Sequence, residues 1–210
     1  MNLRQLLKDR KLEILRKVWH ALNGLTVVAI YQFDFLSKNN MSRILIGILF
    51  LSVLSEYVRL SNRDINLKIK KYFNLIMRKR EYEGVSGIPF YLAGCCFSIT
   101  FFSKTIAVIS ILNLALGDPF ASFCGRKWGH LSFKFKNGKS YIGFVSSMIL
   151  CSLVSYIYLK FFSPPQKYGI LFAAGSCGFT GAISELISFI DDNLFVPVFS
   201  SIVLYIFFNA

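Results

Sequence analysis

The chain has 210 residues, of which 54% are hydrophobic, 16% aromatic and only 17% charged, and its mean hydropathy is +0.52. A soluble domain of this length carries about 25% charged residues, so the composition excludes an ordinary soluble domain and indicates one membrane-embedded unit. The net charge of +13 is also found in nucleic-acid-binding proteins, but here the basic residues alternate with apolar segments of membrane length. That alternation is typical of topogenic charge, and we expect no nucleic-acid partner.

The first 17 residues are basic and contain five leucines at roughly helical spacing. Leucines at this spacing among lysines and arginines are typical of an amphipathic helix on an anionic membrane surface. We therefore predict a basic amphipathic segment over residues 1–17 and a single transmembrane domain over residues 18–210.

Seven apolar segments follow, each near the roughly 20 residues that a helix needs to cross the hydrocarbon core. In chain order they cover residues 18–36, 42–61, 86–102, 104–124, 141–162, 166–188 and 193–209. The third and the seventh are near the lower limit of about 17 residues. The segments predict an all-α, polytopic integral membrane protein with about seven transmembrane helices.

The five cysteines lie in or beside these apolar segments. Their spacing is that of neither a zinc site nor a disulfide framework, so we interpret them as small buried hydrophobic residues. They are Cys95, Cys96, Cys124, Cys151 and Cys177.

Positive charge gathers on one side of the predicted bundle. With a cytoplasmic N-terminus, 18 of the 24 lysines and arginines lie in cytoplasmic segments, Arg59 lies at the inner end of the second span, and five lie outside. The positive-inside rule therefore places the N-terminus in the cytoplasm. The membrane would be the cytoplasmic (plasma) membrane of a prokaryote, or the endoplasmic reticulum or another organelle membrane of a eukaryote.

Polar residues that are costly in a bilayer lie toward the same predicted cytoplasmic face. They are His20, Glu56, Arg59, Asp118, Glu185, Asp191, Asp192 and Asn193. Intramembrane polar groups indicate functional sites, although residues at helix ends can also reach water directly. For Glu56 and Arg59, a local i,i+3 ion pair is an equally good interpretation.

The sequence LGDPFASFCGRKWGH, residues 116–130, interrupts the fourth apolar segment with an acid and a proline. Its glycines would let the backbone approach a ligand closely, and Arg126 between them supplies positive charge. Asp118 offers hard oxygen ligands suited to Mg²⁺ shared with phosphates, and we expect Pro119 to loosen the helix there. Ser140 opens the fifth segment, where it can cap a helix whose N-terminus favours phosphate. These parts predict a nucleoside triphosphate site, although the chain has no GxxxxGK[ST] loop.

The same residues carry a resemblance to a known family. Gly117-Asp118-Pro119-Phe120-Ala121, then Gly125-Arg126-Lys127-Trp128-Gly129 and Lys139-Ser140, resemble the core of the polyprenol kinase family, which includes dolichol kinase, phytol kinase and CTP-dependent diacylglycerol kinase. Other groups resemble the family's further elements: Arg16-Lys17 with His20, Glu56 with Arg59, Arg78-x-x-Glu81 before Ser86-Gly87, and Glu185 with Asp191-Asp192-Asn193 and Pro197. The similarity extends from about residue 16 to about residue 200.

The resemblance implies a membrane lipid kinase. Such an enzyme would transfer the γ-phosphate of CTP, or of another nucleoside triphosphate, to the hydroxyl of a polyprenol, phytol or diacylglycerol at the cytoplasmic face. Asp118 would hold Mg²⁺, or another divalent cation, between the β- and γ-phosphates while basic side chains neutralise the developing charge. Asp192 or Glu185 would be a second metal ligand or would accept the hydroxyl proton.

The residues of this implied site fall into three groups. The catalytic residues are Asp118, Lys139, Arg16, Lys17, Glu185 and Asp192, with Asp118 and Asp192 as metal ligands. The nucleotide-binding residues are Gly117, Gly125, Arg126, Gly129, Ser140, Gly143 and Asn193. His20, Glu56, Arg59, Arg78 and Glu81 complete the site, and the partners are a lipid alcohol substrate and membrane lipids.

One position departs from the family pattern. The family commonly has Lys-Ser-x-Glu-Gly-Ser, whereas this chain places Ile142 where the acid would stand. Either that acid is dispensable or another acid, such as Glu185, has its role. Two other functions remain as alternatives: a phosphatidate cytidylyltransferase, whose D-R-x-D signature this chain does not match, and a non-catalytic transporter or pseudo-enzyme. A transporter would place polar groups through the whole thickness of the membrane.

Overall fold

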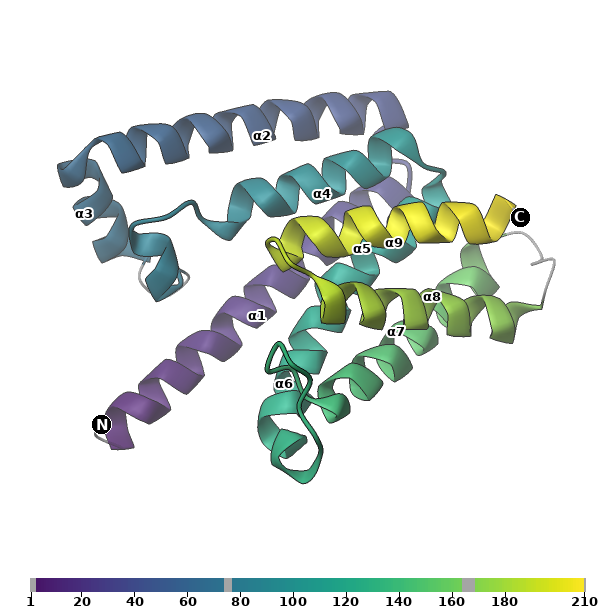
Figure 1. The fold of residues 1–210 in the computed structure, drawn as a ribbon. Coiled ribbons are helices and arrows are strands. Elements are labelled where there is room, and N and C mark those ends of the chain that lie inside the picture. Colours follow the sequence, from purple (N-terminus) through teal and green to yellow (C-terminus); the bar gives the residue numbers. More distant parts are fainter. Residues whose placement is uncertain (1–2, 74–76, 164–168, 210) are drawn as a thin grey trace.

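A computed structural model describes residues 3–73, 77–163 and 169–209, and every regular element among them is helical (Figure 1). The long helices are α1 (Leu3–Gln32), α2 (Lys38–Ser61), α3 (Arg63–Phe73), α4 (Gly87–Phe101), α5 (Lys104–Leu112), α6 (Asp118–Trp128), α7 (Tyr141–Phe162), α8 (Ile170–Ile187) and α9 (Asp192–Asn209). Three short turns join them: η1 (Lys79–Tyr82), η2 (Asn113–Gly117) and η3 (Gly129–Leu131).

Polar side chains set the ends of the helices around the second span. The Ser37 hydroxyl accepts a hydrogen bond from the Asn40 backbone N–H (3.3 Å) and begins α2. Asn62 ends α2, and its side-chain oxygen accepts from the N–H groups of Asp64 and Ile65 (3.0 and 3.2 Å). The chain therefore turns sharply at Asn62, and α3 leaves the axis of α2 (Figure 1).

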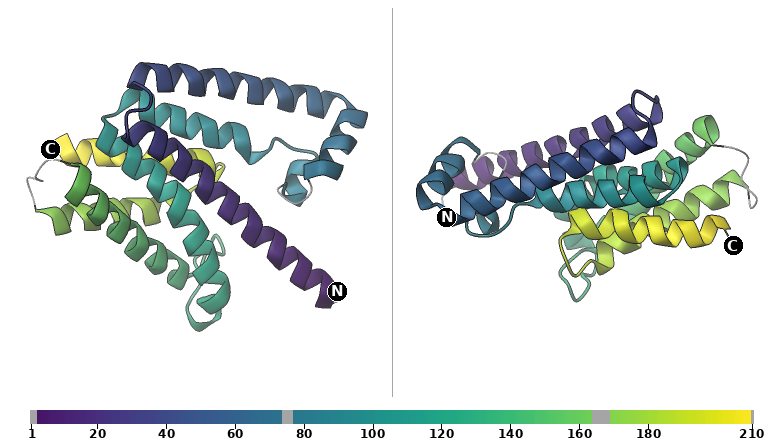
Figure 2. Two further views of the ribbon diagram at one scale, coloured as in Figure 1. Left: turned by 180° about the vertical axis from the view of Figure 1, so that it is seen from behind. Right: turned by 90° about the horizontal axis from the view of Figure 1, so that it is seen from above.

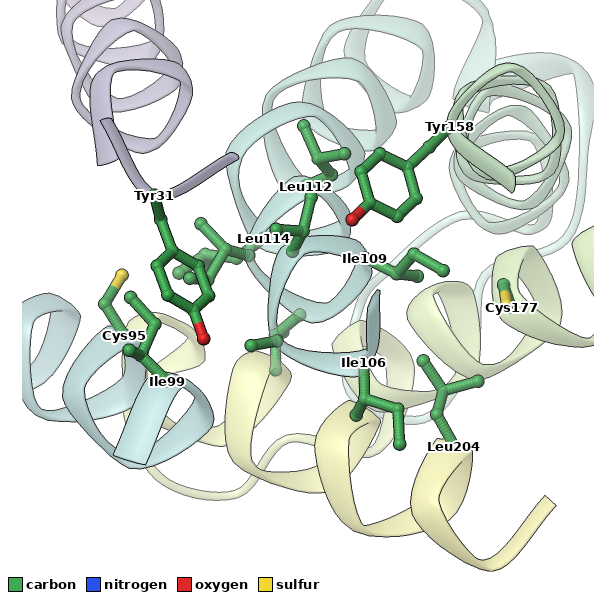
Figure 3. Close-up of a cluster of buried hydrophobic side chains, with 14 of the residues drawn as sticks. Tyr31, Cys95, Ile99, Ile106, Ile109, Leu112, Leu114, Tyr158, Cys177 and Leu204 are labelled. Carbon is green, nitrogen blue, oxygen red and sulfur yellow. The ribbon is translucent and has the colours of Figure 1, made fainter. Parts of the chain in front are cut away.

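Helix α5 forms the centre of the bundle. Its residues 106–112 are all buried, and α1, α4, α7 and α9 pack around it. Figure 3 shows side chains of α5 together with Ile99 of α4, Tyr158 of α7 and Leu204 of α9. Close packing of this kind is the main source of helix association in a bilayer, because lipid tails are as apolar as the side chains.

The outer helices are arranged in pairs around this centre. Helix α7 packs most extensively against α8 and next against α6, while α4 packs against α9 and is covered by α2 (Figure 2). Helix α2 leaves most of its apolar side chains exposed. An apolar helix with an exposed apolar surface is suited to face lipid.

The helix that carries Asp118 changes its hydrogen-bonding pattern without breaking. Residues 104–131 form one continuous helical run, in which η2 is a π-helical turn directly before α6. Pro119 follows this turn, and because it has no N–H to donate, the hydrogen-bond ladder is interrupted at that point of the run. The loosening expected at Pro119 therefore takes the form of a π-helical turn, an irregularity that is frequent at functional sites.

Five helical runs in the described part of the chain are long and apolar enough to cross a membrane: α2, Lys104–Leu131, α7, α8 and α9. The prediction of an all-α polytopic membrane protein is confirmed, but the number of such runs is lower than the seven predicted. The predicted first span, residues 18–36, begins in α1 and extends four residues past its end at Gln32, and α1 is not among the helices apolar enough to cross a membrane. The predicted third span is α4, which is apolar but has 15 residues. At 1.5 Å per residue it is about 22 Å long, whereas the hydrocarbon core is about 30 Å thick.

The other predictions about segments can be compared directly with the helices. The second, fifth, sixth and seventh predicted spans correspond to α2, α7, α8 and α9, except that residues 166–168 lie outside the described part. Residues 3–17 are the first part of α1, so they form one helix with the residues that follow. All five cysteines are free and buried, which confirms their interpretation as small hydrophobic residues.

Candidate active site

A cavity of about 550 Å³, lined by many charged side chains, lies among residues of α1, α6, α7, α8 and α9. Its volume is in the range of small-molecule sites. The charged side chains that line it are Lys17, Arg78, Arg126, Lys134, Lys139, Asp118, Glu185 and Asp192. Five of these are basic and three are acidic, so the cavity suits an anionic ligand that also brings a cation.

Asp118 lies in this cavity at the start of α6, paired with Lys17 of α1. The Lys17 Nζ and Asp118 Oδ2 atoms are 2.6 Å apart, and the two side chains are 16% and 10% exposed. Water screens such a pair poorly, so the pairing fixes the position of both groups. The other carboxylate oxygen of Asp118 accepts no hydrogen bond from a described residue, and it is therefore available to a ligand.

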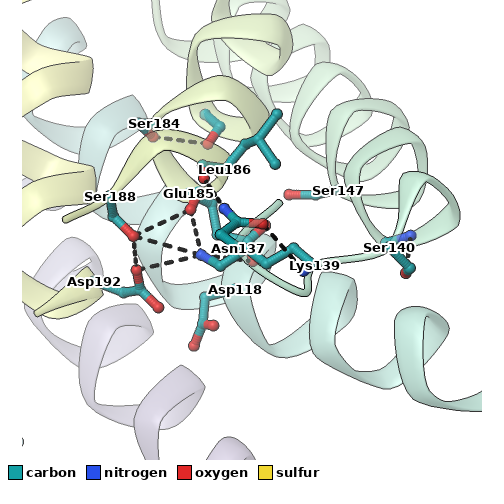
Figure 4. Close-up of polar contacts among 12 residues, drawn as sticks. Asp118, Asn137, Lys139, Ser140, Ser147, Ser184, Glu185, Leu186, Ser188 and Asp192 are labelled. Carbon is teal, nitrogen blue, oxygen red and sulfur yellow. Dashed lines mark hydrogen bonds and ion pairs between the residues drawn. The ribbon is translucent and has the colours of Figure 1, made fainter. Parts of the chain in front are cut away.

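Lys139 joins the loop before α7 to the junction of α8 and α9 (Figure 4). Its Nζ lies 3.6 Å from Glu185 Oε1 and 3.4 Å from both Asp192 Oδ1 and Ser188 Oγ, and it also donates to the Glu185 carbonyl. Ser188 in turn donates a hydrogen bond to Asp192. The ammonium group therefore holds two carboxylates beside the cavity and is their shared counter-ion.

A tight turn places Lys139 and Lys134 on the same wall of the cavity. The Gly138 N–H donates to the Phe135 carbonyl (2.8 Å), and Gly138 has a φ of 82°, a conformation that glycine adopts easily. Lys134 and Ser140 then pair as an isolated antiparallel bridge. Asn137 fixes the turn to α8 by donating to the Leu186 carbonyl (2.6 Å).

Sequence reasoning missed Lys134, Ser188 and Asn137 as parts of this region. A signal for the turn was present, because the Asn137-Gly138 dipeptide is a strong turn former. Nothing in the sequence indicated that the turn would dock against the end of α8, since that contact is tertiary.

The glycines of the basic cluster pack α6 against the first turn of α7. A Cβ atom on Gly125 would lie 2.8 Å from the Ser140 hydroxyl oxygen, and one on Gly143 would lie 2.9 Å from the Ala121 carbonyl. A Cβ on Gly129 would also come within 3.0 Å of Ser140. Ser140 caps α7 as the sequence predicts, because its hydroxyl accepts from the Gly143 N–H (3.1 Å). These glycines therefore line the cavity and also permit the close contact that builds it.

Two further predicted residues lie near Asp118. Arg78 lines the same cavity as Asp118. His20 packs edge-on against the ring of Tyr91, with centroids 4.7 Å apart. Its Nε2 is buried without a hydrogen-bond partner among the described residues. The imidazole therefore packs against Tyr91 from the same helix, α1, that carries Lys17 three residues earlier.

Several predicted residues lie outside the cavity wall. A Cβ on Gly117 would lie 2.8 Å from the sulfur of Cys151, so this glycine packs η2 against α7. The Asn193 amide donates to the Gly87 carbonyl (3.4 Å), and Arg16 donates to the Met77 carbonyl (3.3 Å). Their predicted roles in nucleotide binding or catalysis remain predictions.

Glu56, Arg59 and Glu81 form a separate network at the end of α2. Arg59 is buried and pairs with Glu56 at 2.7 Å, as the i,i+3 interpretation expected. None of the three residues lines the cavity. Ile142, at the position of the family's usual acid, is not part of the cavity wall either, whereas Glu185 is.

The donor set fits a divalent cation only if a ligand supplies the remaining oxygens. In the described ranges no group of three or more histidines, cysteines and acids is placed to hold a metal ion by itself. Mg²⁺ is commonly bound by one or two carboxylates together with substrate phosphates and water. Asp118, with its available oxygen, and Asp192 match that pattern, so a nucleotide-bound cation is compatible with this cavity.

The fold and the cavity together describe a polytopic, all-α membrane protein with one cavity lined by both basic and acidic side chains.

The chain is 29% identical to CTP-dependent diacylglycerol kinase 1 of Saccharomyces cerevisiae, over 95% of this chain and 73% of the relative. It is 26% identical to the protein of that name from Schizosaccharomyces pombe, over 94% of each chain. It is also 25% identical to probable phytol kinase 1, chloroplastic, of Oryza sativa subsp. japonica, over 92% of this chain and 64% of the relative.

These similarities confirm the resemblance to the polyprenol kinase family: the chain is a homologue of CTP-dependent diacylglycerol kinases and phytol kinases, which are lipid kinases. No family profile matches the chain, and no solved structure matches it.

Proposed function

We propose that this protein transfers the γ-phosphate of CTP to the hydroxyl of a membrane lipid, with diacylglycerol as the preferred acceptor. The observation that carries the proposal is the arrangement of the Lys17–Asp118 pair and the Lys139–Glu185–Asp192 cluster around one cavity. Three relatives matched over 93–95% of this chain are named for diacylglycerol, which is the reason for choosing that acceptor first.

In this proposal the basic residues of the cavity bind the triphosphate. Lys17 pairs with Asp118 and Arg78 lines the same cavity, while Lys134 and Lys139 lie on the wall formed by the tight turn. Positioned cations stabilise the charge that develops during phosphoryl transfer, and in this chemistry positioning and electrostatics provide most of the acceleration. Asp118 and Asp192 would hold a divalent cation, whose contribution is charge neutralisation at the phosphates.

The reaction requires one acid–base group besides these cations. The lipid hydroxyl oxygen forms a bond to the γ-phosphorus, the bond from that phosphorus to the β–γ bridging oxygen breaks, and CDP leaves. We assign the hydroxyl proton to Glu185, which lies within α8 and so is nearer the membrane interior than Asp192. The products are CDP and the lipid monophosphate, and Glu185 returns its proton to water.

The cavity has to open toward the cytoplasm for CTP to enter. In the topology derived from the sequence, most lysines and arginines fall on the same face as Asp118, Glu185 and Asp192, which line this cavity, and the positive-inside rule supports a cytoplasmic opening. The acceptor hydroxyl then meets the nucleotide at the interface, while the acyl chains stay in the bilayer. We propose residues 18–210 as the catalytic transmembrane domain.

A transfer assay with the purified protein tests the proposed function. CTP, ATP, GTP and UTP are each combined with diacylglycerol, phytol and a polyprenol in mixed micelles containing Mg²⁺. We expect phosphatidate and CDP from the pair of CTP and diacylglycerol, at a higher rate than from any other pair. Release of pyrophosphate with a CDP-linked lipid would instead identify a cytidylyltransferase, and no turnover with any pair would contradict a lipid kinase.

Loss of the Ser140 cap should weaken nucleotide binding. Ser140→Ala removes the hydrogen bond to the Gly143 N–H, and losing such a cap costs about 1 kcal/mol. Because Ser140 also contacts Gly125 and Gly129 in the cavity wall, we expect the KM for CTP to rise about fivefold. The matched control is Ser37→Ala, which removes the cap of α2 far from the cavity. An equal change of KM in both variants would show that the effect is not local.

A further inference from the structure

Arg59 is a buried cation outside the candidate active site. It lies at the end of α2, is 2% exposed, and donates five hydrogen bonds. Two go to the Glu56 carboxylate (3.2 and 2.7 Å), one to the Asn66 side chain (3.0 Å), one to the Glu81 carbonyl (3.1 Å) and one to the Gly84 carbonyl (2.7 Å). A guanidinium has five N–H donors, so the geometry uses its whole hydrogen-bonding capacity.

The partners of Arg59 hold one connecting segment, residues 77–87, from several directions. Glu56 accepts from the Ser86 N–H (2.8 Å), and Asn66 donates to the Tyr82 carbonyl (3.1 Å). The Glu81 carboxylate accepts from the backbone N–H groups at both ends of the segment, 2.8 Å from Arg78 N and 3.2 Å from Gly87 N. These contacts go mostly to main-chain atoms, so they fix the path of the backbone and not merely a side chain.

The other end of this segment reaches the cavity. Of the described residues in 77–87, Arg78 is the one whose side chain lines it. Its backbone is fixed by Glu81, and the preceding carbonyl, that of Met77, accepts from Arg16 of α1. The Arg78 side chain itself donates no hydrogen bond to a described residue, and it lines the same cavity as Asp118. The backbone of Arg78 is thus anchored, while its guanidinium lies at the cavity wall with donors available to a ligand.

We propose that the Arg59 network is a positioning device for Arg78, and that Arg78 binds a phosphate group of the nucleotide. The proposal rests on the proposed function, because it assigns the ligand of Arg78 to the triphosphate. A planar guanidinium can donate two parallel hydrogen bonds to a phosphate, and anchoring its backbone reduces the conformational entropy lost on binding. Arg59 supplies that constraint from outside the cavity through Glu81 and Gly84, without touching the ligand.

A double-mutant cycle tests this coupling. Arg59→Lys keeps the charge but loses the planar fork that reaches both carbonyls. We expect Arg59→Lys to raise the KM for CTP, and the dissociation constant of CTP in calorimetry, about tenfold with little change in kcat. Arg78→Gln should have at least as large an effect, and the double variant should be no worse than Arg78→Gln alone, because Arg59 acts through Arg78. Arg63→Lys, at the exposed start of α3, is the matched control and should leave both constants unchanged.

Folding has to be separated from positioning in this test. Asn66→Ala removes one bond to Arg59 and one to Tyr82 without leaving a buried charge unpaired, so it provides a milder variant if Arg59→Lys is poorly folded. It should also raise the KM for CTP, by a smaller factor. Independent, additive effects of Arg59→Lys and Arg78→Gln on CTP binding would overturn the proposal, as would a lower thermal stability with an unchanged KM. A wild-type protein that binds CTP but transfers no phosphate would contradict the proposed function alone, since the binding cycle still measures the coupling.

Discussion

Replacing Asp118 by asparagine is expected to lower the rate of phosphate transfer at least about 100-fold, the usual effect of removing a group that stabilises transition-state charge. The substitution keeps the shape of the side chain and its position at the start of α6. It removes the negative charge that pairs with Lys17 at 2.6 Å, and a neutral amide is a poor ligand for a divalent cation. The measurement is radiolabel transfer from CTP to diacylglycerol by the purified variant.

Two controls separate chemistry from folding in this experiment. Asp64→Asn removes an exposed carboxylate in the first turn of α3 and should leave transfer unchanged. Asp118→Asn also leaves Lys17 without its partner, so the thermal stability of the variant is measured beside that of the double variant Lys17→Met/Asp118→Asn. The double variant should recover stability, because it contains no unpaired buried charge at these two positions. It should nevertheless remain inactive. Near-wild-type transfer by Asp118→Asn would remove this residue from the mechanism.

The acids of the cavity could be found from the sequence because a charged residue in an apolar segment of membrane length is energetically costly. Asp118 and Glu185 lie in segments of membrane length, and the topology derived from charge counting put both at one face. The structure places them, with Lys17, Lys139 and Asp192, around the same cavity. Their convergence follows from topology alone, since alternate helices bring their ends to the same side of the bundle.

The sequence could not separate residues that line the cavity from residues that support it. Glu56, Arg59 and Glu81 look like further site residues in a linear pattern, but outside their own ion pair they bond mainly to the main chain of residues 78–87. A buried Arg with backbone partners and an Arg facing a ligand have the same sequence signature. The distinction depends on the tertiary path of the segment between α3 and α4, which no local pattern specifies.

The glycines show the same limit of prediction from sequence. A glycine near a basic cluster can admit a phosphate or another helix, and both need the absence of a Cβ atom. In this chain Gly117 meets Cys151 of α7, whereas Gly125 both contacts Ser140 and lines the cavity. The glycines of α8 also differ from one another: a Cβ atom at Gly175 would meet nothing within 4 Å, whereas one at Gly178 would meet Ser152 and one at Gly181 would meet Asn113.

Gly178→Ala is expected to destabilise the protein more than any other single-methyl change on α8. A Cβ atom there would lie 2.4 Å from the Ser152 nitrogen and 2.6 Å from the Met148 carbonyl oxygen, both main-chain atoms of α7. Main chain in the middle of a helix cannot move aside cheaply, so α7 and α8, the most extensively packed pair, have to separate. We expect a loss of about 3 kcal/mol, the upper part of the usual range for overpacking.

Gly175→Ala, one turn earlier on the same helix, provides the matched control. A Cβ atom at Gly175 meets nothing within 4 Å, and alanine is the better helix former by up to about 1 kcal/mol. The control should therefore be neutral or slightly stabilising in detergent thermal-unfolding measurements, while Gly178→Ala lowers the melting temperature clearly. Because α7 begins at the cavity and α8 ends there, Gly178→Ala should also reduce transfer in proportion to the unfolded fraction, with an unchanged KM for CTP in the folded remainder. Equal melting temperatures for the two variants would show that the contact between α7 and α8 is not as close as the structure has it.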